Sequence, residues 1–141
     1  MSASRFTRAE LNGFAQKWTV IRQFCQSSHR QWIGSGGVIQ ETPPESFFNL
    51  AVVLAFSLLD EVLSSMSAHG AFSLPSGAML GKKMATSRSS IEWLNYSSVE
   101  EGKCRRNDLA HRGALIPSAD CREIVELISV ELRWWGAIAQ A

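Results

Sequence analysis

The segment from Pro44 to about Ser67 constrains the fold most, because it is apolar on nearly every side of a helix until Asp60. Pro44 followed by Glu45 suits a first helical turn, where a missing N–H costs nothing and a carboxylate favours the helix dipole. A helix that is apolar around most of its circumference needs other elements packed on several sides. We therefore expect it at the centre of a bundle or against a partner subunit.

Two amphipathic segments can pack against this helix. From about Thr7 to Ser28, apolar residues recur at steps of three and four, as on one face of a helix. A second segment begins near Asp120, which forms a capping-box pattern with Glu123. Its apolar face comprises Ile124, Leu127, Ile128, Leu132 and Trp135. Both segments predict helices.

The intervening region predicts one more long helix. Ser89 or Ser90 can cap it, and it should run to His111, with a break at Gly102 and an end at Gly113. Before it, residues 71–90 form a long connection with a short helix around residues 78–84. Lys82, Lys83 and Arg88 make this connection basic, and solvation and phosphate contact explain them equally well.

We find no convincing strand-like alternation, and the Gly34-Ser35-Gly36-Gly37 cluster is interpreted as a breaker between helices. The predicted fold class is all-α. One domain, residues 1–141, should form an up-and-down bundle of four to five helices, the count depending on the connection at residues 71–90.

Composition limits the function classes. Hydrophobic residues make up 45% and charged residues 19%, as in an ordinary globular domain. The net charge of +1 means that any nucleic-acid binding must come from a local patch. The three cysteines lack CxxC spacing and no histidine pair has metal-ligand spacing, so we expect reduced thiols, no metal and no cofactor. The polar N-terminus and the short apolar run at residues 50–59 predict a cytoplasmic protein that makes no membrane contact.

One segment carries most of the chemistry: Arg106-Asn107-Asp108-Leu109-Ala110-His111. Basic residues near a helix C-terminus are favoured by the macrodipole, but this does not explain Asn107 and His111. Those two residues are four apart and share a helical face. Arg106 and His111 are five apart, which separates them by about 140° on an ideal helix. They converge on one phosphate only if the helix ends or bends between them, or if two copies of the segment meet.

These side chains suit RNA cleavage without metal, in which the neighbouring 2′-OH is the nucleophile. The imidazole of His111 titrates near neutrality and can move a proton at the attacking or leaving oxygen. The guanidinium of Arg106 can bind a phosphate through two parallel hydrogen bonds and offset its developing charge. The amide of Asn107 can orient the ring or hold a phosphate oxygen.

The segment Arg106 to Gly113 resembles the signature of the HEPN superfamily: an arginine, a polar residue, and a histidine after four to six intervening residues. The resemblance implies a helical bundle and a metal-independent endoribonuclease of the kind found in toxin–antitoxin and phage-defence systems. It also implies a homodimer with two motifs facing each other, RNA as the substrate, and a cognate antitoxin or regulatory protein. Arg106 and His111 match the catalytic pair, and Asn107 matches the supporting polar position.

The resemblance extends to neighbouring residues with less precision. The other charged residues of the segment are expected to contact the substrate: Lys103, Arg105, Asp108 and Arg112. Many members place an acidic or polar residue on an earlier helix near the site, a place that Asp60 or Glu61 could fill. Some toxins carry a tyrosine three residues after the histidine that a partner enzyme modifies. Ala114 stands at that position here, so the resemblance does not extend to that form of control.

A second hypothesis is a non-catalytic HEPN-type module that binds RNA, a nucleotide or a partner protein. The remaining candidates are weaker. His29 and His69 stand alone and are interpreted as surface residues, and Cys104 as a packing residue. At most one of Trp134 and Trp135 can follow the core stripe, and we expect the other at an interface, with base stacking as the alternative.

Overall fold

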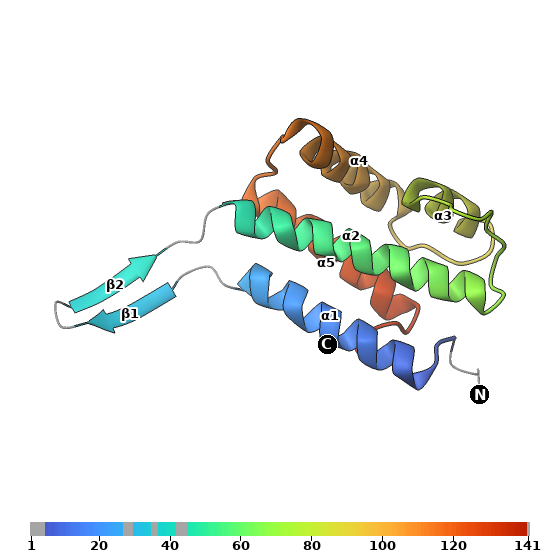
Figure 1. Cartoon of the computed structure of the whole chain (residues 1–141), viewed down its shortest axis with the longest axis horizontal. Helices are drawn as coiled ribbons and strands as arrows, with labels where there is room; N and C mark the ends of the chain where they lie inside the picture. Colours follow the sequence, from blue (N-terminus) through green and yellow to red (C-terminus); the bar gives the residue numbers. More distant parts are fainter. Residues whose placement is uncertain (1–4, 27–29, 35–36, 42–44, 141) are drawn as a thin grey trace.

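The computed structural model describes residues 5–26, 30–34, 37–41 and 45–140. Within these ranges the helices are α1 (Arg8–Gln26), α2 (Glu45–Ala68), α3 (Leu80–Ser87), α4 (Tyr96–Arg112) and α5 (Ser118–Trp134). Figure 1 shows that the four long helices alternate in direction along the chain and pack side by side. The prediction of an all-α bundle is confirmed, and the short helix in the connection sets the number of helices in the described residues at five.

Helix α2 is the central element, because it contacts α1, α3, α4 and α5. Its apolar residues at ten positions are buried: Phe48, Ala51, Val52, Ala55, Phe56, Leu58, Leu59, Val62, Leu63 and Met66. Leu50 and Val53 remain 44% and 38% exposed. We expected α2 either at the centre of the bundle or against a partner subunit. The bundle itself buries most of the apolar surface of α2.

The apolar stretch of α2 is longer than the run of residues 50–59 indicates. Ser46–Ala68 is 23 residues long with a mean hydropathy of 1.8, which by length and composition is enough to cross a membrane. Core helices of soluble proteins have the same properties. In the bundle this stretch packs against helices on several sides, which is the environment of a core helix.

The described residues also contain a two-stranded hairpin, so the prediction of no strands was wrong. Strands β1 (Arg30–Gly34) and β2 (Gly37–Glu41) pair antiparallel, with Arg30 opposite Glu41 and Gly34 opposite Gly37. The β-branched and aromatic residues Trp32, Ile33, Val38 and Ile39, together with the paired Gly34 and Gly37, favour such a hairpin. Figure 1 shows it projecting from the end of the bundle where α1 ends and α2 begins. Ser35, Gly36, Pro43 and Pro44 lie outside the described residues.

Two predicted helix starts were also wrong. Helix α4 begins at Tyr96 instead of Ile91, and it passes through Gly102 without a break. Helix α5 begins at Ser118, so Asp120 lies in its first turn and is not the N-cap residue. A capping box forms at α1 instead: the Thr7 N–H donates to Glu10 (2.8 Å) and the Glu10 N–H donates to Thr7 (3.1 Å).

Candidate functional site

Gly102 lets α4 approach the centre of the bundle closely. A Cβ atom at this position would lie 3.2 Å from Ile124 Cγ2 on α5 and 3.4 Å from Phe56 Cζ on α2. One turn further along α4, the guanidinium carbon of Arg106 lies 5.7 Å from the centre of the Phe56 ring. The small residue at 102 therefore brings the basic half of α4 against the core helix, which places Arg106 beside an apolar surface.

The C-terminal end of α4 is fixed by two features. Gly113 adopts the left-handed conformation (φ +66°) that ends the helix after Arg112, as predicted. The buried Asn49 side chain then holds the following loop: its amide donates to the Ile116 carbonyl (2.9 Å) and its oxygen accepts from the Ile116 N–H (2.8 Å). Asn49 thus ties the loop that follows His111 to the start of α2. Sequence reasoning missed it, because a lone asparagine in an apolar run carries no partner information.

Arg106 is a half-buried cation without an anionic partner among the described residues. Its Nε atom is buried and has no hydrogen-bond partner. The acids that were expected to support the site are used elsewhere. Asp60 pairs with Lys83 on α3, and Glu61 pairs with Lys17 on α1. The expectation that Asp60 or Glu61 completes the site therefore finds no support in these contacts, and Arg106 is left available to an external anion.

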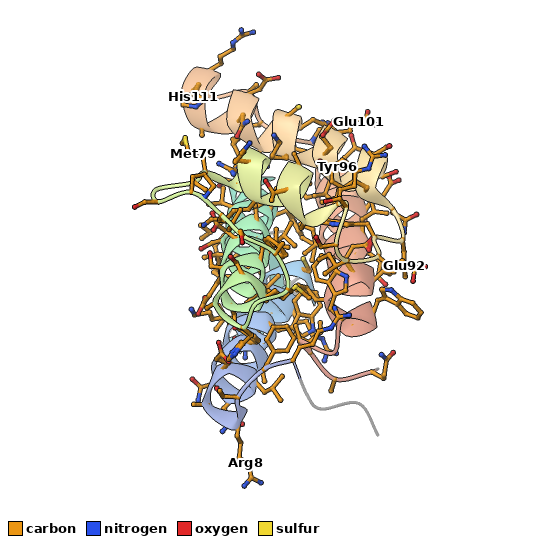
Figure 2. All side chains as sticks on the ribbon, turned by 90° about the vertical axis from the view of Figure 1, so that its right-hand side faces the viewer. Arg8, Met79, Glu92, Tyr96, Glu101 and His111 are labelled. Atoms are coloured by element: carbon orange, nitrogen blue, oxygen red, sulfur yellow. The ribbon has the colours of Figure 1, made fainter. Side chains whose placement is uncertain are left out.

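His111 is exposed, and Asn107 is half-buried. In Figure 2 His111 lies near one end of α4, well separated along the helix from Tyr96 and Glu101. Because α4 is continuous through both Arg106 and His111, their side chains leave the helix about 140° apart. Within the described residues, no hydrogen bond joins Asn107 to His111 or Arg106. One chain alone does not bring the three side chains together.

The other residues that were predicted to contact the substrate lie on different sides of α4. Arg105 turns toward α5 and pairs with Asp120 at 3.0 Å. The ammonium group of Lys103 lies against Gly81 at the start of α3. Asp108 and Arg112 are exposed. Arg105 therefore has a structural partner, whereas Arg112 is exposed on the same helical end as His111.

The basic connection before α4 is partly structural. Lys83 pairs with Asp60, and the guanidinium carbon of Arg88 lies 4.3 Å from the centre of the Tyr96 ring. Lys82 is exposed. Two of the three cations thus have partners inside the bundle, which favours the structural explanation for them.

The start of α4 depends on a buried acid that sequence reasoning also missed. Glu131 on α5 is fully buried, and its carboxylate accepts hydrogen bonds from the backbone N–H groups of Leu94 (2.5 Å) and Asn95 (2.7 Å). Desolvation raises the pKa of Glu131 above its ordinary value, and the two backbone hydrogen bonds only partly oppose this. The helical stripe on α5 predicts that position 131 is near the core but gives no reason for an acid there.

The remaining candidates are two histidines, two tryptophans and the cysteines. His69 lies 2.8 Å from Glu10, and His29 is outside the described residues. Trp135 is buried and donates from its indole N–H to the Glu92 carbonyl (2.8 Å), whereas Trp134 is exposed. This confirms that only one of the two follows the core stripe. None of the three cysteines forms a disulfide within the described residues, and Cys104, expected to pack, is exposed.

Comparison of the chain with protein-family models, with curated proteins and with solved structures finds no significant match. The resemblance to the HEPN superfamily therefore rests on the Arg106–Gly113 segment and on the helical bundle around it. The bundle is common to many functions and cannot by itself select one.

Proposed function

We propose that the protein is a HEPN-type, metal-independent endoribonuclease that acts as a homodimer. The observation that carries the proposal is Arg106: a guanidinium held against the core helix, with no carboxylate partner among the described residues and with a buried Nε that makes no hydrogen bond. The contact with the Phe56 ring gives the Arg106 cation no countercharge, whereas Arg105 on the same helix pairs with Asp120. A phosphate beside the guanidinium would be its anionic partner.

In the proposed reaction the 2′-oxygen of RNA attacks the adjacent phosphorus, and the bond from phosphorus to the 5′-oxygen breaks. The 2′-OH loses its proton and the leaving 5′-oxygen gains one, so the products are a 2′,3′-cyclic phosphate and a 5′-hydroxyl. His111 transfers one of these protons, Arg106 offsets the charge on the phosphate oxygens, and Asn107 orients the imidazole or the phosphate.

The dimer is part of the proposal because Arg106 and His111 diverge on an uninterrupted helix. A two-fold axis that brings two α4 helices together offers a way to place Arg106 of one copy beside His111 of the other. A cognate antitoxin or regulatory protein would restrain such a nuclease in the cytoplasm, and that also belongs to the proposal.

The same divergence favours one alternative: a HEPN-type module that binds RNA, a nucleotide or a partner protein without cutting. Phosphate binding needs Arg106 but does not need His111 at the same phosphate. Such a module would lose RNA binding with Arg106→Ala and would keep it with His111→Ala.

The test is cleavage of single-stranded RNA by the purified protein in excess EDTA. Arg106→Ala and His111→Ala should each lower the rate, the latter by about 10²–10⁴-fold. Arg8→Ala is a matched control, because Arg8 is exposed at the opposite end of the molecule from His111 (Figure 2). RNA with 2′-O-methyl groups should resist cleavage. Cleavage that EDTA abolishes, or that His111→Ala leaves unchanged, would defeat the catalytic proposal.

A further inference from the structure

A groove of about 350 Å³ lies between α1 and α5, and its walls carry three arginines and one glutamate. Arg22 comes from α1, and Arg122, Glu126 and Arg133 come from α5. The groove is distinct from the α4 segment, since none of its lining residues belongs to α4. A volume of this size lies within the range of small-molecule sites.

Two of these cations contact aromatic rings, Arg122 that of Phe48 (5.0 Å) and Arg133 that of Trp18 (5.7 Å), but carboxylate pairing does not explain the three. The nearest acid, Glu126, lies 3.9 Å from Arg133 and its side chain is 70% exposed, so this ion pair is weak. Within the described residues, Arg22 and Arg122 have no carboxylate partner. Guanidinium groups gathered in one groove repel one another unless an anion lies between them.

Arg133 supplies a second, independent indication. Its side chain is only 18% exposed and its Nε atom is buried without a hydrogen-bond partner. One terminal nitrogen donates to Ser129 (3.0 Å), and the guanidinium carbon lies 5.7 Å from the centre of the Trp18 ring. These contacts hold the guanidinium in the wall of the groove, where its exposed part can donate hydrogen bonds to an anion.

The groove also has a part that suits an uncharged body. Trp18 is buried beneath it, and the thiol of Cys25 lies in its wall. Burial raises the pKa of this thiol, against the opposing effect of Arg122, so Cys25 stays neutral and does not compete with an incoming anion. Cationic walls above an aromatic floor match a ligand with a phosphate and a planar or apolar body.

We infer that the groove between α1 and α5 is a second anion site that binds a phosphate ester of nucleotide type. A free nucleotide and a phosphate of an RNA strand share this chemistry. This site lies outside α4, and its binding of a phosphate ester does not depend on RNA cleavage by the α4 segment.

The test measures binding of pyrophosphate, of adenosine monophosphate and of a six-nucleotide RNA to the full chain. It is done in an Arg106→Ala background, which removes the proposed phosphate contact on α4. Arg22→Gln with Arg122→Gln should weaken binding by about tenfold or more. Arg8→Gln is the matched control, an exposed arginine on the same helix α1 as Arg22, and should leave binding unchanged. If the double variant fails to fold, Arg22→Gln alone serves, because Arg22 is exposed.

Protection of Cys25 locates the bound probe. In a Cys104→Ser background, which removes the exposed thiol, saturating probe should slow alkylation of Cys25 several-fold. Tighter binding of the mononucleotide than of the RNA would identify a free nucleotide as the ligand, and the reverse would identify the strand. Absence of binding by all three probes, or equal loss with Arg8→Gln, would overturn the inference. So would binding that gives Cys25 no protection.

Discussion

The Glu131 carboxylate on α5 accepts the backbone N–H of Asn95 at 2.7 Å, across 36 residues of sequence, at the point where α4 begins. The N–H groups at a helix start have no partner within the helix and need an acceptor from elsewhere. The Asn95 side chain, at the N-cap position, makes no capping hydrogen bond. A tertiary contact thus takes the place of a local cap and satisfies backbone N–H groups at the start of α4.

Glu131→Ala should lower the free energy of unfolding by about 2–4 kcal/mol, because it leaves the N–H groups of Leu94 and Asn95 without their acceptor. Glu131→Gln should cost less, since the amide oxygen still accepts. Urea denaturation of the three proteins measures the difference. The exposed Glu123→Gln is the control, and a loss in Glu131→Ala no larger than in that control would contradict the capping role.

The pH dependence of Glu131 has a defined sign. Its folded pKa is raised, so the folded state binds the proton more tightly than the unfolded state, whose pKa is near the ordinary 4.5. The stabilisation from this proton is present below pH 4.5 and is lost as the pH rises through the raised pKa. Over that window the wild type should lose stability relative to Glu131→Gln. A difference between the two that stays constant with pH would contradict this.

Glu10 should behave in the opposite way. A hydrogen bond from Ser65, with others from the Thr7 backbone and from His69, lowers the Glu10 pKa from 4.5 to about 2. The resulting stabilisation is present above pH 4.5 and is lost as the pH falls toward 2. Glu10→Gln should therefore be less stable than the wild type at pH 7, and the gap should close in acid. Thermal unfolding from pH 2 to 7 measures it, and a gap that persists at pH 2 would refute the assignment.

These two glutamates show what sequence patterns could and could not predict. The periodicity of apolar residues correctly predicted the three amphipathic or apolar helices α1, α2 and α5, because burial of a helical stripe is a local signal. The Thr7–Glu10 capping box is also local, yet the pattern was assigned to Asp120–Glu123, where Asp120 instead pairs with Arg105. Glu131 and Asn49 act through partners 36 and 67 residues away, which no spacing rule reveals.

The same difference between local patterns and contacts between distant residues applies to the candidate site. The sequence predicted the identity of Arg106, Asn107 and His111, their place near the end of a helix and the stop at Gly113. It left open whether the helix bends between Arg106 and His111, and the continuous α4 answers that for one chain. The hairpin of β1 and β2 was missed because each strand has only five residues and the glycines between them also suit a helix-to-helix connection.

Two glycines inside helices should respond differently to substitution. Gly13→Ala should raise the free energy of unfolding by about 0.5–1 kcal/mol, because its Cβ would meet nothing within 4 Å and alanine favours a helix. Gly102→Val should lower it by about 1–3 kcal/mol, since its Cβ alone would lie 3.2 Å from Ile124 and its branches would overpack the α4–α5 contact. Denaturant unfolding compares the two, and a stable Gly102→Val would contradict the close approach of α4.

Arg106 of one copy and His111 of the other are expected to act at the same phosphate across a dimer. If each site uses Arg106 from one copy and His111 from the other, then Arg106→Ala and His111→Ala homodimers are both inactive. Random exchange makes about half of the dimers mixed, and in each mixed dimer one of the two sites has both wild-type residues. A mixture of the two inactive proteins should therefore regain about a quarter of the wild-type activity per chain.

The mixture is incubated long enough for subunits to exchange, and RNA cleavage is then measured over a dilution series that spans dimer dissociation. Arg106→Ala mixed with the Arg106→Ala, His111→Ala double variant is the control, because no combination of these chains contains a wild-type Arg106. Recovery in the first mixture alone supports a shared site, and it should disappear on dilution as the dimer dissociates. If a mixture shown to contain mixed dimers recovers no activity, the shared-site model is rejected. Both residues would then have to act within one chain, which the continuous α4 makes geometrically unfavourable.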